Sequence, residues 1–165
     1  MSLRPLNPVL VATDPGDIAE VRHDDVNNHR ALYATRSFNA NDVIVSFGAK
    51  ASHDTPNYLT LQVGEGIHIE LFPEYLECAN HSCMPNCFFD TTRFEFVALR
   101  EIAVGEELTF FYPSAEWDMD RSFQCFCGTP QCFGHIQGAR YLPEEAFQRY
   151  RFTDFIIRKK GQIKP

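Results

Sequence analysis

The sequence has no long hydrophobic run and no excess of positive charge. No window approaches the roughly 18 uninterrupted apolar residues of a membrane-spanning helix, and the first eight residues, MSLRPLNP, lack the apolar stretch of a secretion signal. With 15 Lys and Arg against 22 Asp and Glu, the formal charge is −7, which argues against binding to the phosphate backbone of nucleic acids. We therefore expect an intracellular protein, cytoplasmic or nuclear, with no membrane and no direct nucleic-acid partner.

The chain also lacks internal repeats, low-complexity segments and any Pro-, Gly- or Ser-rich linker. Its 165 residues suit one domain. Its composition of 44% hydrophobic residues, with 15 Phe, supplies enough apolar surface for a core and argues against disorder. The negative charge favours a partner with basic segments.

Short apolar or alternating runs dominate the chain up to about residue 112, and such runs are typical of β-strands. They lie at 31–34, 43–47, 58–63, 67–71 and 94–99. Turn-forming residues follow at 39–42, 64–66 and 90–92, so residues 58–71 are predicted to form a hairpin. The predicted fold class is mostly β.

The two ends differ from this strand-rich part. Residues 1–28 are rich in Asp, Asn and Pro and are predicted to be a lightly structured lead-in, with an edge strand at 9–12 as an option. Near the other end, Pro143 followed by Glu144 and Glu145 is typical of a helix start. We expect one C-terminal helix from about residue 143 to 151 or beyond, followed by a basic tail whose cations suit the end of a helix dipole.

Three of the six cysteines, Cys125, Cys127 and Cys132, lie close together on a segment that contains Gly and Pro. In a chain with no secretion signal, clustered cysteines more often bind metal than form disulfides. Tetrahedral zinc needs four ligands and is well served by thiolates, so a fourth ligand must come from elsewhere. The candidates are Cys78, Cys83, Cys87 and His135. The alternative is a set of small buried hydrophobic side chains.

Three motifs occur in order: NHSCMPNC at 80–87, GEELTFFY at 105–112 and CFCGTPQC at 125–132. They resemble the NHSCxPNC, GEELTxxY and post-SET CxCxxxxC patterns of SET-domain protein lysine methyltransferases. The resemblance covers roughly residues 29–138. It implies a SET-domain fold of small β-sheets with knot-like threading, a post-SET zinc loop and a C-terminal helix. S-adenosylmethionine would bind on one face, with a lysine side chain in a channel from the opposite face.

On this basis the chain divides into four parts. They are a lead-in at 1–28, a SET domain at 29–120, a post-SET zinc loop at 121–138 and a C-terminal helix with a basic tail at 139–165.

The resemblance also implies roles for three aromatic residues. Tyr112, which closes the second motif, is expected beside the transferred methyl group, where its hydroxyl orients the amine. Phe110 corresponds to the family's Phe/Tyr switch position, at which Phe leaves room for added methyl groups, so we expect di- or trimethylation. Tyr58 is a candidate for lining the lysine channel.

Other matched positions imply contacts with the cofactor and the metal. Asn80 and His81 correspond to residues that contact S-adenosylmethionine, and Phe126 to an apolar residue against its adenine, with plain loop packing as the alternative. Cys83 corresponds to the family's fourth zinc ligand, which implies the zinc set Cys83, Cys125, Cys127 and Cys132. The expected cofactor-binding residues are His29, Arg30, Ala31, Leu32, Tyr33, Asn80, His81, Tyr112 and Phe126.

The chain departs from the family pattern at several points. Family members carry a Gly-x-Gly loop at the positions of residues 29–31, because glycine lets the backbone approach the cofactor without a Cβ in the way. His29 and Ala31 therefore either reshape this loop or partly block it. The family's usual Asp is Phe111 here, and an Arg often found just before the first motif is Glu77. The insert between the strand at residue 58 and the first motif is minimal.

The leading hypothesis is an S-adenosylmethionine-dependent lysine N-methyltransferase that acts on a histone-like or other basic protein segment. The altered loop and the short insert leave two alternatives open. One is a SET fold recruited to a small-molecule reaction, and the other is a catalytically silent binding module that keeps zinc for stability. A second copy of the chain is a candidate partner.

Overall fold

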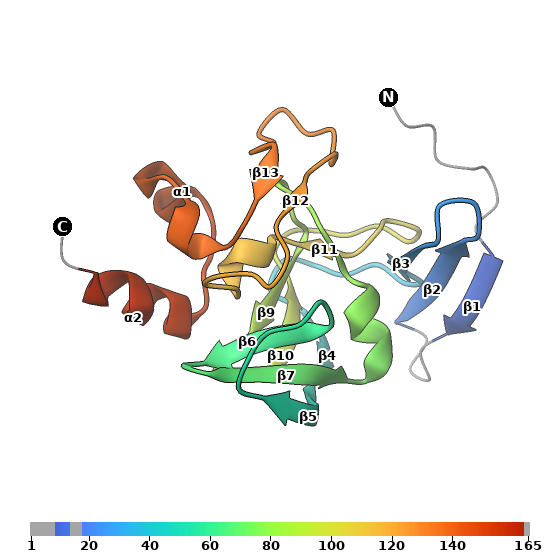
Figure 1. Ribbon diagram of the computed structural model, residues 1–165. Helices are drawn as coiled ribbons and strands as arrows, with labels where there is room; N and C mark the ends of the chain where they lie inside the picture. Colours follow the sequence, from blue (N-terminus) through green and yellow to red (C-terminus); the bar gives the residue numbers. More distant parts are fainter. Residues whose placement is uncertain (1–8, 14–17, 164–165) are drawn as a thin grey trace.

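The computed structural model describes residues 9–13 and 18–163 of the chain (Figure 1). In this part the chain folds into small β-sheets with few helical segments, so the predicted mostly β class is confirmed. The two α-helices lie together on the left in Figure 1, on the other side of the molecule from the N-terminal sheet. Over these same residues, no helix combines the length and the apolar character needed to cross a membrane.

The N-terminal sheet has the order β1-β2-β3, with both pairs antiparallel. Its strands are Val9–Thr13, Ala19–Asp24 and His29–Ala34. The edge strand and the strand at 31–34 were predicted from their apolar residues. The middle strand, β2, was not, because only Ala19 and Val21 among its six residues are apolar. The segment predicted to be a lightly structured lead-in thus supplies the central strand of this sheet.

A second sheet has the order β5-β7-β6 and contains the predicted hairpin. Its strands are Gly48–His53, Ile67–Phe72 and Thr60–Gly64. β6 and β7 pair antiparallel across a turn in which Gly66 has φ +59, a conformation that suits glycine. The sequence did not predict β5, since its Gly, Ala, Lys and Ser residues have little β-propensity and form a strand through pairing with β7.

The central sheet has the order β4-β10-β9-β11-β8. Its strands are Val43–Ser46, Glu95–Ala98, Cys87–Asp90, Thr109–Phe110 and Asn80–His81. β11 lies between β8 and β9, which come earlier in the chain, and runs parallel to both. This interleaved order agrees with the threaded fold that the motifs imply.

The side chain of Asn86 fixes this insertion. Its Nδ2 donates to the carbonyl of Glu107 at 2.8 Å, and its Oδ1 accepts from the N–H of Thr109 at 2.9 Å. Asn86 is buried, so a side chain without these partners would leave two backbone groups unsatisfied in the interior. The chain after Glu107 is thereby held in register beside residues 80–86.

The main hydrophobic core lies between the three sheets. At its centre the ring of Phe89 is 4.4 Å from Phe96 and 4.7 Å from Phe110, measured between centroids. Full burial of side chains of this size stabilises the fold by roughly 1.5–3 kcal/mol each. The largest fully buried apolar residues include Leu32, Phe38, Leu76, Phe89, Phe96, Ile102, Leu108, Phe111, Ile136 and Ile156.

Shorter elements connect these sheets to the C-terminal part. The 3-10 helices are η1 (Glu74–Cys78), η2 (Tyr112–Ser114) and η3 (Ala139–Tyr141). The antiparallel strands β12, Phe123–Gln124, and β13, His135–Ile136, flank the cysteine-rich loop.

The C-terminal end contains two helices instead of the predicted single helix. They are α1, Glu144–Arg149, and α2, Asp154–Gln162. The chain between them is extended because Tyr150 stacks on Phe111, with centroids 4.0 Å apart, and its hydroxyl donates to the carbonyl of Cys83 at 2.7 Å. Thr153 then caps α2 by accepting from the N–H of Ile156 at 3.3 Å. Tertiary contacts therefore interrupt a helix that local pattern alone would continue.

Candidate functional site

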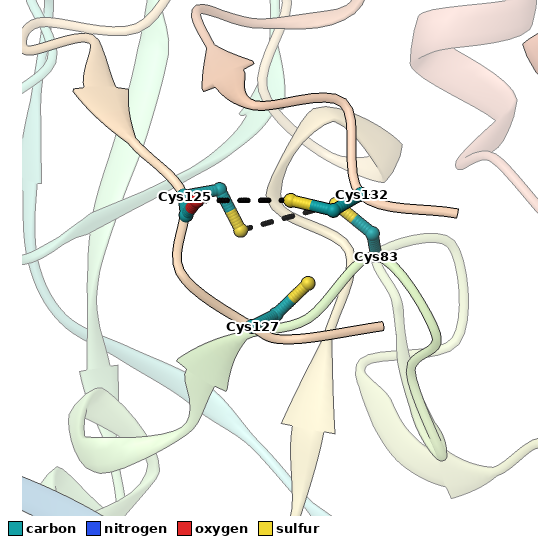
Figure 2. A group of neighbouring side chains, drawn as sticks. All are labelled: Cys83, Cys125, Cys127 and Cys132. Carbon is teal, nitrogen blue, oxygen red and sulfur yellow. Dashed lines mark hydrogen bonds between the residues drawn. The ribbon is translucent and has the colours of Figure 1, made fainter. Parts of the chain in front are cut away.

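Four cysteine side chains converge from two segments. Cys83 follows β8, whereas Cys125, Cys127 and Cys132 lie on the loop between β12 and β13 (Figure 2). Their four Sγ atoms all lie within 4.8 Å of one another, and those of Cys83 and Cys125 are 3.9 Å apart. Thiolates at about 2.3 Å from a tetrahedral zinc ion stand about 3.8 Å apart. The group therefore has the donors and the spacing to hold a metal ion.

The loop is folded around these sulfur atoms. Gly128 has φ +71, which permits the tight turn after Cys127. The N–H of Phe133 points to Cys83 Sγ at 3.5 Å, and the N–H of Gly134 to Cys132 Sγ at 3.4 Å. Backbone donors of this kind favour the thiolate form, which is the form that binds metal.

Burial and hydrogen bonding act differently on the thiols. Burial raises the pKa of Cys125 to about 11. Burial also opposes ionisation of Cys127, but hydrogen bonds from Thr129, whose Oγ1 is 3.2 Å from the sulfur, bring the pKa of Cys127 down to about 6. A cation is therefore needed before all four sulfurs can carry charge together, which again fits a metal ion. Among the candidates for the fourth ligand, Cys83 joins the group, and Cys78, Cys87 and His135 lie outside it.

Beside the cysteine loop lies a groove of about 710 Å³. Five of the residues predicted to contact the cofactor line it: His29, Asn80, His81, Tyr112 and Phe126. The Phe126 side chain is 86% exposed, so its ring stands free at the edge of the groove.

The other four predicted residues do not line this groove. Ala31 and Leu32 are buried in the N-terminal sheet. The backbone carbonyl of Arg30 accepts a hydrogen bond from Asn80 Nδ2 at 2.7 Å. The ring of Tyr33 packs against the Arg22 guanidinium, whose Cζ is 4.2 Å from the centroid of the Tyr33 ring. Residues 29–31, where the family pattern has its Gly-x-Gly loop, form the start of β3, and of these three only His29 lines the groove.

His81 connects the groove to the cysteine group. Its Nδ1 accepts from the N–H of Tyr112 at 3.1 Å, which places the imidazole proton on Nε2, 3.3 Å from Cys83 Sγ. Burial lowers the pKa of His81 to about 4, so the ring is neutral at physiological pH. A single neutral imidazole thus holds a cysteine sulfur and the backbone of Tyr112 in fixed relation.

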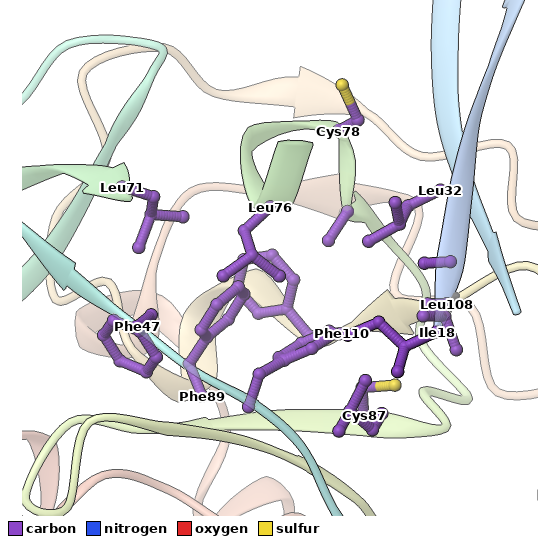
Figure 3. Close-up of a cluster of buried hydrophobic side chains, with 14 of the residues drawn as sticks. Ile18, Leu32, Phe47, Leu71, Leu76, Cys78, Cys87, Phe89, Leu108 and Phe110 are labelled. Atoms are coloured by element: carbon purple, nitrogen blue, oxygen red, sulfur yellow. The ribbon is translucent and has the colours of Figure 1, made fainter. Parts of the chain in front are cut away.

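A narrower channel of about 240 Å³ leads to the same tyrosine. Tyr58, Phe110 and Tyr112, the three predicted catalytic residues, all line it. Leu71 and Leu76, which belong to the core cluster shown in Figure 3, form part of its apolar wall. The three aromatic residues therefore share one cavity.

Their positions along the channel differ. Tyr58 is 76% exposed, whereas Phe110 is buried with its ring centroid 4.7 Å from that of Tyr112. The Tyr112 hydroxyl donates to the carbonyl of Ala79 at 3.4 Å, and burial raises the pKa of this hydroxyl. Tyr112 and Phe123 line both the channel and the groove, so the two cavities meet there.

Three acidic residues that no motif predicted line the channel: Glu77, Glu116 and Asp120. Of these, Glu116 is only 7% exposed. Burial raises the pKa of Glu116 to about 7 from an ordinary 4.5, and its Oε1 accepts from the N–H of Gln62 at 2.9 Å. The sequence signal for Glu116 is slight: a single acid between apolar neighbours, shortly after Tyr112.

Comparison with known proteins agrees with this geometry. A model of the SET domain matches residues 29–113. The chain belongs to the SET-domain family. A solved structure, the crystal structure of KRYPTONITE in complex with mCHG DNA and SAH, shares the fold, with a TM-score of 0.52 at 21% identity over 64% of this chain and 26% of that chain.

Curated relatives of this SET domain include several methyltransferases. It is 45% identical over 114 residues to methyltransferase flvH of Aspergillus flavus, which covers 66% of this chain and 64% of that protein. It is 36% identical over 87 residues to a histone-lysine N-methyltransferase, H3 lysine-36 specific, of Schizosaccharomyces pombe, which covers 49% of this chain and 11% of that protein. The chain thus spans less than two thirds of the length of either relative.

The cysteine group predicts that the purified SET domain carries one metal ion per chain. Cys132→Ser removes a ligand and is expected to lower both the metal content and the stability, the latter by several kcal/mol, or roughly 10 °C in Tm. Elemental analysis and thermal melting measure the two effects. Cys78→Ser is the matched control, because Cys78 is buried outside the group. Equal metal content in both variants would contradict the site.

The buried carboxyl predicts a pH-dependent stability difference. Glu116 has a pKa of about 7 in the folded chain and an ordinary value of 4.5, so between these values the folded state binds more protons than the unfolded state. The contribution of Glu116 to the free energy of unfolding is therefore fully present below pH 4.5 and is lost as the pH rises through 7. Glu116→Gln should equal the parent at pH 4 and exceed it at pH 8 by on the order of 3 kcal/mol.

Chemical denaturation at the two pH values measures this difference. Glu145→Gln, at an exposed position of α1, is the control and should follow the parent at both pH values. A Glu116→Gln curve parallel to that of the parent would show that the carboxyl ionises normally.

Proposed function

We propose that this SET domain is an S-adenosylmethionine-dependent N-methyltransferase that acts on a lysine side chain. The observation that carries the proposal is the meeting of a narrow aromatic channel and a wider polar groove at Tyr112 and Phe123. A cavity of about 240 Å³ with an apolar wall suits an unbranched aliphatic amine, and the groove of about 710 Å³ suits a larger polar molecule.

The groove fits the cofactor that the family uses. Asn80 and His81 offer polar groups, and the exposed Phe126 ring offers a flat apolar surface for a base. S-adenosylmethionine, when bound, supplies the methyl group. Of the residues that replace the family's glycine loop, Ala31 is buried outside the groove and only His29 bears on it, so the substitution leaves most of the groove open.

The residues of the channel prepare the amine. A lysine amine has an ordinary pKa near 10.4 and needs a free lone pair to react. The apolar wall disfavours the ammonium form, and the rings of Phe110 and Tyr112 restrict the amine to one line of approach. Because the Tyr112 hydroxyl donates to Ala79, its oxygen presents lone pairs to the place where the two cavities meet.

Zinc is the proposed occupant of the cysteine group, since four thiolate donors at this spacing suit it best among common divalent ions. Cys83, Cys125, Cys127 and Cys132 would hold it. Its part is structural: it fixes the loop that carries Phe126, and through Cys83 and His81 it fixes the backbone of Tyr112.

The proposed substrate is a histone-like or other basic protein segment. The net charge of −7 favours a basic partner, and several relatives, including the one from Schizosaccharomyces pombe, are named for histone lysines. A small-molecule amine is the second candidate. Between the β6–β7 hairpin and β8 the chain holds only η1, so little protein surface adjoins the channel for gripping a peptide.

Binding and turnover test the proposal together. Calorimetry should detect S-adenosylmethionine binding by the parent and by Tyr112→Phe. Methylation of lysine peptides, followed by mass, should fall about 10- to 100-fold in Tyr112→Phe, because one polar contact near the reacting atoms is lost. No binding by the parent, with recovery in the His29→Gly/Ala31→Gly variant, would mean that the chain has given up this cofactor.

The identity of residue 110 predicts the degree of methylation. Phe110 leaves space in the channel for an amine that already carries methyl groups, so di- and trimethylated products are expected. Phe110→Tyr adds a hydroxyl there and should shift the products toward monomethylation, which product masses over a time course report. Phe123→Tyr, at another ring of the channel, controls for a general loss of rate. An unchanged distribution of products in Phe110→Tyr would refute this role.

A further inference from the structure

Glu116 is held rigidly in the wall of the channel. Its backbone N–H donates to Tyr112 at 3.1 Å, and its carbonyl accepts from Ala139 at 2.8 Å. On the side-chain end, the N–H of Gln62 donates to Oε1, while the Gln62 side chain accepts from the N–H of Trp117 at 3.0 Å. The backbone of Glu116 is thus held by η2 and η3, and its buried carboxyl is held by β6.

In the part of the chain from residue 18 to 163, the Glu116 carboxyl has no cationic partner. Among residues 18–163, no Lys, Arg or His forms an ion pair with Glu116 at up to 4.0 Å. Burying a carboxylate without a partner is costly, and the cost shows as the raised pKa of about 7. The buried side chain of Asn86, by contrast, is paired within the fold.

The other charged groups around the channel do not neutralise it. Glu77, from η1, is also acidic, and its nearest cation is Lys50, at 3.6 Å from Oε1. Asp120 and Arg121 line the channel from the loop after η2, and they form a pair with each other at 3.8 Å. Tyr112 is neutral, because burial and the nearby charges of acids including Glu116 raise its pKa. The channel therefore has an excess of negative charge and an apolar wall.

We propose that Glu116 is the receptor for a linear aliphatic ammonium ion, binding the charged amine inside the channel and accepting one of its protons. This inference rests on the proposed function and specifies how that function selects its substrate. The N–H bond breaks, its electron pair stays on nitrogen as the lone pair, and the proton binds the carboxylate. The result is a neutral amine and a neutral carboxylic acid.

Matched acidities make this transfer feasible in the channel. An amine loses its high pKa where the wall is apolar, while the carboxyl gains basicity in the same surroundings. Two groups with similar pKa values exchange a proton at little cost. With a pKa of about 7 for Glu116, the proton can return to solvent at neutral or alkaline pH once the channel is free.

A probe that needs no methyl transfer tests the binding step. n-Butylammonium imitates the lysine side chain, and n-butanol is its neutral counterpart. NMR titration at pH 8 should show the parent preferring n-butylammonium at least tenfold, with the preference falling toward pH 6 as Glu116 is protonated. Glu116→Gln keeps an acceptor for the N–H of Gln62 but should show no preference at either pH.

Glu77→Gln is the matched control, because it removes another carboxyl that lines the channel and should keep the preference. Loss of the preference in Glu77→Gln with retention in Glu116→Gln would overturn the assignment. Absence of any preference in the parent would overturn it as well.

Kinetics separate this inference from the proposed function. With a lysine peptide at pH 7, kcat of Glu116→Gln should fall at least tenfold and recover in part by pH 9.5, where more of the peptide amine is neutral in solution. A purely structural role gives no such recovery. If the parent and Glu116→Gln methylate the peptide equally fast at pH 7, the inference about Glu116 is overturned while the proposed function stands. A parent that binds n-butylammonium through Glu116 but methylates no lysine peptide would overturn the proposed function and leave the ammonium site standing.

Discussion

The structure depends on the insertion of β11 between β8 and β9. The buried Asn86 amide holds this insertion by pairing with the backbone of Glu107 and Thr109. Because the inserted strand leads directly into Tyr112, the same constraint sets this ring beside Phe110 and its backbone against His81. The fixed register of β11 is therefore what brings Tyr112 together with His81, which lies far from it in the sequence.

Two contacts at Cys83, close to β8, attach the C-terminal part of the chain to the central sheet. The cysteine group joins the loop after β12 to Cys83, and the Tyr150 hydroxyl donates to the Cys83 carbonyl. Phe111, where the family pattern has Asp, stacks on Tyr150 and packs in the cluster that also buries Phe152. The apolar replacement thus serves the C-terminal helices, whereas the neighbours of Phe111 in the motif face the channel.

Much of the fold and site was predictable wherever local sequence carries the information. Alternating apolar residues predicted the β6–β7 hairpin. The spacing of Cys125, Cys127 and Cys132, together with the resemblance of Cys83 to the family's fourth ligand, indicated the cysteine set that the structure brings together. Prediction failed where tertiary contacts override local preference. β5 forms by pairing with β7, the break between α1 and α2 follows from the contacts of Tyr150, and Glu116 looks ordinary until its burial is known.

The sequence by itself determined several of the strands, the family motifs and the close spacing of Cys125, Cys127 and Cys132, because these depend on residue type and spacing. Only the tertiary structure decided which of residues 29–31 faces the groove and which acids line the channel. Those properties are set by the direction of a side chain and by the water excluded around it. Both arise when segments far apart in sequence pack together, and no local pattern encodes them.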